Sequence, residues 1–465
     1  EDSARLTAFC PHPAALARRA LARRAPCAAP PPIAGNAGRH RCRAMAPPGV
    51  VVDVGSGWTK MGYAGNLEPQ VVIPTCVANS ARGGRGGVHT SSAQGTMGII
   101  DADFYIGDEA FARKDSPHYL LSYPVQRGRV DNWDDMERFM QQAIFRSLRC
   151  VPEDHNFLLT ETPFNTPENR ELTAEIMFET FNVNGLHIAV QAVLALYAQW
   201  VNANYEDPNA SPDLTGLVVD SGDGLTYAIP VADGFVVSSC IQEIPLGGRH
   251  VTQFISDMLT DRREPVPPEQ RMEAARTIKE QHAYICKDVV QEYQKFDQDP
   301  RKFKTFSGSH YKTKEAWNIQ IGYERFLAPE IFFHPEIFET SVTTPLPEVV
   351  DTCIVNCPID YRRRLFNNIV LCGGSTTFQN FKERLQYDVQ RIVDARLLQA
   401  EKVSGSRPTD VAVKVHGERK AQRFSAWLGG SFLASEPRFN ALFKTKQEYE
   451  EVGPSCMRAS AVLSA

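Results

Sequence analysis

Two short loops rich in Asp and Gly, each placed after a buried apolar strand, constrain the fold of this chain more than any other feature. Asp53-Val-Gly-Ser-Gly57 follows the run Val50–Val52, and Asp220-Ser-Gly-Asp-Gly224 follows the run Leu217–Val219. After each loop the chain resumes apolar β-type sequence, so each unit is predicted to be a strand, a tight turn and a second strand. The repetition of this unit indicates an internal duplication, with one loop in each half.

The first loop has the composition of a phosphate-binding turn. Glycines let the backbone approach phosphate oxygens closely, and the N–H groups around Gly55, Ser56 and Gly57 can form an anion nest. Lys60 follows shortly afterwards and can reach back to the phosphates. Asp53, at the end of the strand, can hold a hydrated Mg²⁺ or Ca²⁺. Gly-rich hairpins are common, so this loop alone is a weak signal.

The second loop strengthens the case for a nucleotide. Two such loops facing each other would clamp a triphosphate, and the carboxylates of Asp220 and Asp223 would be suited to a nearby cation. For a single loop, turn formation by Asp and Gly would be a sufficient explanation. Two rival phosphate motifs do not fit: the Rossmann fingerprint needs a third glycine where Lys60 stands, and the P-loop needs a Gly-Lys pair, which the chain lacks.

Further glycine turns follow along the chain. Gly373–Ser375 comes after the strand signal Ile369–Leu371 and suits a loop that contacts adenosine, where side chains would clash. Gly429–Ser431 is expected to open a helix. Lys279-Glu280, on a helix expected around residues 271–290, is another candidate for nucleotide contact, although its charge pattern alone indicates only a solvated pair.

Helical patterns between the loops favour an α/β architecture. Asp131–Arg149 has an apolar stripe with helical period, and Thr166-Pro167 has the sequence of a helix start. Gly185 is expected to mark a loop before an apolar segment. Polar segments without periodicity are expected to be surface insertions, at Asn79–Gly98, Asn202–Leu214 and Asp297–Lys314.

Charge is distributed unevenly. The formal net charge is −5, yet residues 1–44 hold eight Arg against only two acidic residues, so the remainder is more acidic than the total. An acidic body argues against general nucleic-acid binding, which depends on Lys and Arg neutralising phosphates. Residues 1–44 are rich in Ala and Pro without apolar periodicity; we interpret them as a disordered extension or as sequence upstream of a start at Met45, with a transit peptide as the alternative.

Cysteine spacing and hydropathy exclude two further classes of site. The sequence contains 11 Cys without a CxxC pair and has no HExxH-like spacing, so reduced, buried thiols are expected and a structural zinc site is not. No apolar run approaches the roughly 20 residues that span a bilayer, so no transmembrane anchor is expected.

Five ordered motifs resemble the actin fold superfamily. The resemblance implies a duplicated, two-lobed α/β ATPase fold of four subdomains with ATP in the central cleft. The first lobe would hold residues 50–198 and 424–465 (subdomains 1 and 2), and the second lobe residues 199–423 (subdomains 3 and 4). The motifs are Val52-Asp53-x-Gly-Ser-Gly-x-x-Lys60, Gln191-Ala-Val-Leu, Asp220-Ser-Gly-Asp-Gly, Gly373-Gly-Ser-Thr and Trp427-x-Gly-Gly-Ser.

The same resemblance assigns roles to individual residues. Around the phosphates it places Gly55, Ser56, Gly57, Lys60, Gly222, Asp223 and Gly224. Along the nucleoside it places Gly248, Lys279, Glu280, Gly373, Gly374 and Ser375. The hydrated Mg²⁺ or Ca²⁺ would be organised by Asp53, Gln191 and Asp220, and the attacking water by Gln191, Asp220 and Tyr227.

Four further segments resemble the actin-related proteins more closely than conventional actin. Their sequences resemble that of the family member that pairs with actin-related protein 2 in the seven-subunit actin-related protein 2/3 complex. This complex nucleates branched actin filaments. This implies actin monomers, filaments and nucleation-promoting factors as partners, and a place in the cytoplasm at the actin-rich cell cortex and projections. The segments begin at Pro152-Glu-Asp-His, Asn165-Thr-Pro-Glu-Asn, Gly322-Tyr-Glu-Arg-Phe and Asn356-Cys-Pro-Ile-Asp.

One position departs from the family pattern. A His usually follows the Thr of the second phosphate loop and helps to order the attacking water, whereas this chain has Tyr227. A phenol is a poor proton acceptor near neutral pH, with a reference pKa of about 10. ATP binding is therefore expected, with slow hydrolysis, or none unless assembly closes the cleft.

Three other members of the superfamily provide alternative readings. A sugar kinase would need a catalytic base besides the cation-site Asp residues, and the sequence offers none. A heat-shock chaperone would need a C-terminal peptide-binding domain, for which the chain leaves no room. A nuclear actin-related protein of a chromatin-remodelling assembly shares the same cleft and is separated from the first reading only by its partners.

Overall fold

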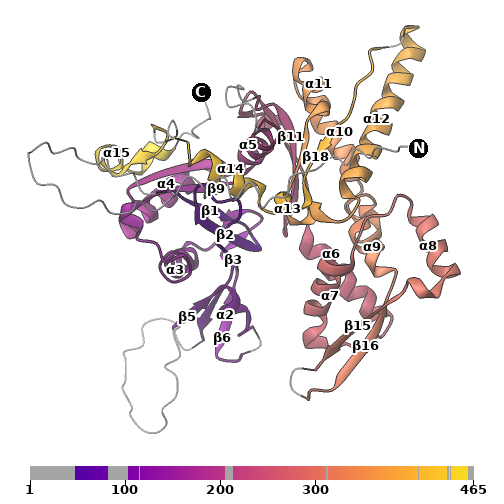
Figure 1. Ribbon diagram of the computed structural model, residues 1–465, viewed down its shortest axis with the longest axis horizontal. Coiled ribbons are helices and arrows are strands. Elements are labelled where there is room, and N and C mark those ends of the chain that lie inside the picture. The colour runs from indigo at the N-terminus through magenta and orange to yellow at the C-terminus, as the bar shows by residue number, and fades with distance from the viewer. Residues whose placement is uncertain are drawn as a thin grey trace, which may run out of the picture. The chain divides into compact units, whose positions relative to one another are not determined.

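The computed structural model describes residues 48–81, 103–114, 116–204, 213–310, 313–406, 408–436, 439 and 441–458. They belong to one compact unit, Pro47–Ala465 (Figure 1). The predicted leader, residues 1–44, lies outside the described residues, as do most of the predicted insertions at 79–98 and 202–214.

The first large sheet is built around the hairpin that carries the first predicted loop. β1 and β2 of this hairpin are antiparallel, and β1 runs parallel to β9, which in turn runs parallel to β10. Across the sheet the strands are β19 (Lys444–Thr445), β10 (Gly185–Val190), β9 (Asn156–Glu161), β1 (Val50–Val54), β2 (Trp58–Tyr63) and β3 (Val71–Pro74).

The second large sheet repeats this arrangement around the second loop. β11 and β12 form an antiparallel hairpin, and β11 runs parallel to β17, which runs parallel to β18. The repeated order of hairpin and parallel strands agrees with the internal duplication predicted from the loops. The strands are β13 (Phe235–Val236), β12 (Thr226–Ala232), β11 (Gly216–Ser221), β17 (Ile369–Cys372) and β18 (Val415–His416), with β14 (Gln242–Ile244) paired to β12.

Helices and three small sheets complete the unit. The small sheets are β4 (Val77–Ser80), β5 (Phe104–Ile106) and β6 (Tyr119–Ser122); β7 (Val125–Gln126) and β8 (Arg129–Val130); and β15 (Lys304–Ser309) and β16 (Ala316–Ile321). The α-helices are α2 (Gly107–Phe111), α3 (Trp133–Gln142), α4 (Pro167–Glu175), α5 (Gln191–Ala203), α6 (Gly248–Asp261), α7 (Pro268–His282), α8 (Val289–Gln298), α9 (Glu324–Glu330), α10 (Leu346–Asn356), α11 (Ile359–Asn367), α12 (Phe381–Ser404), α13 (Arg419–Gln422), α14 (Ser425–Leu433) and α15 (Lys446–Val452).

Two predicted helices form as expected. The segment Asp131–Arg149 contains α3 followed by a π-helical turn at Ala143–Leu148, and its apolar stripe is largely buried. Thr166 caps α4, because its hydroxyl accepts a hydrogen bond from the Asn169 N–H. Both helices pack on the first large sheet, in the core that contains Phe139 and Phe157.

α5 and α14 pack against each other between the two large sheets (Figure 1). The prediction that Gly429–Ser431 opens a helix is wrong, because these residues lie inside α14. A Cβ at Gly429 would lie 1.9 Å from the carbonyl oxygen of Leu194 in α5, so glycine permits the close approach of the two helices. The indole of Trp427 donates to the carbonyl of Val51 and ties α14 to β1.

Two other expectations are corrected. Gly185 does not lie in a loop: it begins β10 and pairs with Asn156 and Thr445. Its absent side chain leaves room for Asn156, whose Oδ1 would lie 2.8 Å from a Cβ at this position. The segment Asp297–Lys314 is not an irregular insertion, because it includes β15, although most of its described residues remain exposed or half-buried.

The cysteine prediction is confirmed for the described residues. Eight Cys are free thiols, seven of them buried, which is consistent with their use as small apolar residues. Among the described helices, none has the length and apolarity to cross a bilayer.

Candidate functional site

The two predicted loops lie in contact with each other. A Cβ at Gly57 would lie 2.8 Å from Cβ of Asp223, so the glycine allows the first loop to approach the second. A Cβ at Gly224 would lie 3.9 Å from Cβ of Ser56. The duplicated hairpins therefore bring their turns together from two different sheets.

Asp53 lies at the centre of a buried polar network. Its Oδ2 accepts from Lys60 Nζ at 2.8 Å, and its Oδ1 accepts from the Thr160 hydroxyl at 2.6 Å and from Gln191 Nε2 at 3.0 Å. The register of the first hairpin explains the first contact, because Asp53 and Lys60 are direct partners across β1 and β2. The start of α5 supplies Gln191, and the end of β9 supplies Thr160.

The second hairpin places Asp220 in the corresponding position. Asp220 pairs across the ladder with Tyr227, where the first hairpin has Lys60. Burial raises the pKa of the Asp220 carboxyl to about 6; nearby Asp53 also raises it, while Lys60 lowers it. The pKa of Lys60 is raised by Asp53 and Asp220, against the effect of its burial. One ammonium group thus lies among two carboxylates, which leaves an excess of negative charge.

The third predicted loop contacts the second. Gly373 has a φ of 90°, in the left-handed region, and a Cβ there would lie 2.3 Å from the carbonyl oxygen of Ser221. The Ser375 hydroxyl donates to the Gly222 carbonyl at 2.7 Å. A Cβ at Gly222 or Gly374 would meet no heavy atom of the described residues within 4 Å, so open space adjoins both loops.

The N-terminus of α6 joins the same group of residues. The Gly248 N–H donates to the Gly222 carbonyl at 2.9 Å, and Lys279 Nζ of α7 donates to the Gly248 carbonyl at 2.9 Å. Burial lowers the pKa of Lys279. Glu280 is directed elsewhere, since it pairs with Arg276 at 3.1 Å and is largely exposed. The structure thus gathers the predicted site residues, with Glu280 at the margin.

Tyr227 is buried beside an aromatic ring. Its ring packs 5.8 Å from the ring of Phe164, measured between centroids, and the side chain is almost fully buried. Burial raises the pKa of the phenol, with further contributions from Glu243 and Asp220. The phenol is consequently an even poorer proton acceptor than a free tyrosine.

Sequence reasoning missed several residues of this site. Thr160 bonds both Asp53 and, at 3.2 Å, Gln191; its position at the end of an apolar strand was the available signal. Arg249 pairs with Asp223 at 3.3 Å between Nε and Oδ2. Only the fold brings it there, because nothing in its local sequence distinguishes it from other exposed arginines.

The donor set suits a cation that is held through water. Within the described ranges, no group of three or more His, Cys, Asp or Glu side chains could ligate a metal directly. Asp53 is nonetheless a buried and Asp220 a half-buried carboxylate, both of which interact with the ammonium group of Lys60, and open space adjoins the glycine loops. Buried negative charge of this kind is stabilised by a nearby divalent ion.

Comparison with known proteins agrees with this geometry. The family described as Actin matches residues 46–461. Actin-related protein 3 of Drosophila melanogaster is 53% identical over 422 residues, which cover 89% of this chain and 98% of the relative. Actin-related protein 3 of Caenorhabditis elegans is 51% identical over 430 residues, which cover 90% and 98%. The chain therefore belongs to the actin family and groups there with the actin-related proteins 3.

Proposed function

We propose that this chain is the ATP-binding, actin-related subunit of the complex that nucleates branched actin filaments. Nucleotide would bind between two lobes, formed by residues 50–198 with 424–465 and by residues 199–423. The observation that carries the proposal is the contact between the two loops, in which Gly57 leaves room for Asp223. Two hairpins from separate sheets then offer backbone N–H groups to one ligand.

Each part of the site has a role in this proposal. The backbone of Gly55–Gly57 and Gly222–Gly224, together with Lys60, would hold the phosphates. Asp53, Gln191 and Asp220 would orient the water shell of Mg²⁺ or Ca²⁺, which neutralises phosphate charge when bound. Gly248, Lys279, Gly373, Gly374 and Ser375 would line the nucleoside, and Glu280 would lie at its edge.

ATP hydrolysis is expected to be slow. Gln191 can position a water molecule, but its amide already donates to Asp53 and Thr160. Tyr227 offers a phenol that holds its proton at neutral pH. We therefore assign the chain a structural, nucleating role in which nucleotide holds the lobes together and turnover is slow.

Kinship with actin-related protein 3 supports this proposed assembly. Its partners would be actin-related protein 2 and the other subunits of a seven-subunit complex, actin monomers and filaments, and nucleation-promoting factors. The chain would act in the cytoplasm, at the actin-rich cortex and cell projections. Assembly with these partners would close the cleft between the lobes.

Calorimetric titration of the purified chain with ATP and Mg²⁺ tests nucleotide binding. Lys60→Ala and Asp220→Asn should each weaken binding at least about tenfold, because each disturbs a buried charge balance (about 1.4 kcal/mol or more). Lys287→Ala, at an exposed lysine, is the matched control. Wild-type protein that does not bind ATP would contradict the proposal.

Affinity purification with mass spectrometry tests the assembly: recovery of chromatin-remodelling subunits in place of actin-related protein 2 would favour the nuclear alternative.

A further inference from the structure

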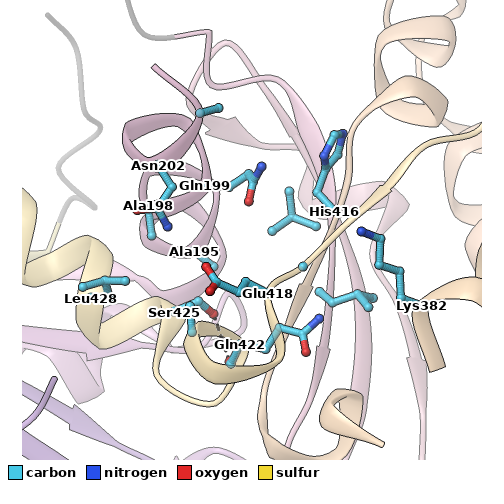
Figure 2. Close-up of a pocket in the computed structure, with 15 residues that line it drawn as sticks. Ala195, Ala198, Gln199, Asn202, Lys382, His416, Glu418, Gln422, Ser425 and Leu428 are labelled. Atoms are coloured by element: carbon cyan, nitrogen blue, oxygen red, sulfur yellow. Dashed lines mark hydrogen bonds between the residues drawn. The ribbon is translucent and has the colours of Figure 1, made fainter. Parts of the chain in front are cut away.

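One cavity is lined by none of the candidate nucleotide-site residues. It has a volume of about 300 Å³, at the lower end of the range for small-molecule sites. α5 forms one wall, and the start of α12 with the segment around α13 forms the other. Figure 2 shows Gln199 of α5 and Lys382 of α12 pointing into the space between these walls.

Two opposite charges line this cavity without pairing. Lys382 supplies an ammonium group and Glu418 a carboxylate. Among the residues that the structure describes, neither side chain makes an ion pair or a hydrogen bond. Each is therefore available to a ligand, and together they would select a molecule that carries both charges.

A buried amide adds a second, independent sign of a ligand. Gln422 is only 3% exposed, and its Oε1 has no hydrogen-bond partner among the described residues. Gly417 leaves room for this amide, because a Cβ there would lie 2.0 Å from Gln422 Nε2. A buried carbonyl without a donor is unfavourable, so a ligand N–H or O–H group that reached this oxygen after a rotation of the amide would stabilise it.

The cavity is linked to the nucleotide loops through the backbone. The carbonyl of Gln422 accepts from the N–H of Gly373 at 3.0 Å, and the same carbonyl accepts from the Ser425 hydroxyl at 3.2 Å. α5, which forms the opposite wall, begins with Gln191. An occupant would thus touch elements that also hold residues of the nucleotide site, without entering it.

We propose that this cavity binds a small zwitterion of the free α-amino acid type. Its carboxylate would face Lys382, and its ammonium group would face Glu418 and, once the Gln422 amide rotates, donate to Oε1. The rest of the lining combines small apolar residues such as Ala195 and Ala198 with the polar side chains of Gln199, Asn202 and His416. At about 300 Å³ the cavity has room for a polar side chain such as that of glutamine.

The test is a ligand-observed NMR titration of the full chain with three probes: L-glutamine, its amide L-glutaminamide and N-acetyl-L-glutamine. Wild-type protein should bind L-glutamine at least about tenfold more tightly than either analogue, which lacks one charge (about 1.4 kcal/mol). Lys382→Gln should abolish the discrimination against the amide, and Glu418→Gln the discrimination against the acetylated form. Lys414→Gln, at an exposed neighbour outside the lining, is the matched control.

The same titration in saturating ATP separates this site from the nucleotide site. Binding of L-glutamine should persist, and Gln422→Met should weaken it whether or not the chain binds ATP. Displacement of L-glutamine by ATP, equal affinity for all three probes, or no binding at all would each overturn the proposal.

Discussion

The guanidinium group of Arg276 on α7 lies over the indole ring of Trp58 on β2, with Cζ 4.7 Å from the ring centroid. Arg423 also lies near this ring, at 5.9 Å. Trp58 belongs to the hairpin of the first phosphate loop, whereas Arg276 lies one turn before Lys279. The two sides of the proposed cleft are thus joined by a cation–π contact, and Lys114 and Glu273, 3.9 Å apart, make a second link.

Removing this contact should speed nucleotide exchange. Trp58→Ala is expected to raise the dissociation rate of a fluorescent ATP analogue about two- to thirtyfold, since a cation–π pair contributes roughly 0.5 to 2 kcal/mol. Stopped-flow displacement measures the rate. Arg276→Ala should have a similar effect, and Arg391→Ala, at an exposed arginine of α12, controls for its loss of positive charge. An unchanged rate in Trp58→Ala would show that the contact does not hold the cleft.

The ionisation of Glu330 should lower the free energy of unfolding as pH rises. Burial raises the pKa of this carboxyl to about 7, although Arg384 and His334 oppose the shift; Cys286 donates to it and Asp388 lies nearby. The folded state therefore binds a proton that the unfolded state has lost, and the cost of ionisation grows from about pH 4.5 to pH 7. Full ionisation costs roughly 3 kcal/mol.

Glu330→Gln tests this assignment by urea unfolding at several pH values. The variant should be about as stable as wild type near pH 4.5 and more stable above pH 7, so its pH profile should be flatter. Parallel profiles would assign the pH dependence to other groups.

The sequence predicted this fold best where structure follows from local pattern. The apolar runs before Asp53 and Asp220 predicted buried strands, and the turns rich in Asp and Gly predicted a reversal of the chain. What the pattern could not supply was contact between distant segments. The residues around Gly185 look alike whether this glycine ends a helix or packs against Asn156 in a sheet. The need for a glycine at position 429 is apparent only from the structure, where Leu194 lies beside it.

Some residues of the candidate site could be identified from local sequence, and others only from the fold. Its glycines and Asp53 could be identified from one strand and one turn. Thr160 had only a weak signal, its place at the end of an apolar strand, because its hydroxyl acquires a role only when β9 lies beside β1.

The two kinds of glycine should respond differently to the same substitution. Gly429→Ala would place a methyl group against the backbone of Leu194, which no side-chain rotation can relieve, so a loss of several kcal/mol of stability is expected. Gly374→Ala points into open space and should leave unfolding by urea nearly unchanged while weakening ATP binding. Equal destabilisation by both substitutions would contradict the assignment of Gly374 to the ligand side.

Restoring the family's histidine at Tyr227 should accelerate hydrolysis. An imidazole has an ordinary pKa of about 6.5 and can accept a proton at neutral pH, whereas the pKa of this buried phenol lies above its usual value of about 10. Tyr227→His should therefore raise single-turnover γ-phosphate release from the assembled complex at least about tenfold, within the range of general-base contributions. Tyr227→Phe keeps the ring packed on Phe164 and removes only the hydroxyl, so it should release phosphate at the wild-type rate. If the Phe variant were markedly slower, the phenol itself would take part in ordering water; if the His and Phe variants were equally slow, the limit on turnover would lie in closure of the cleft.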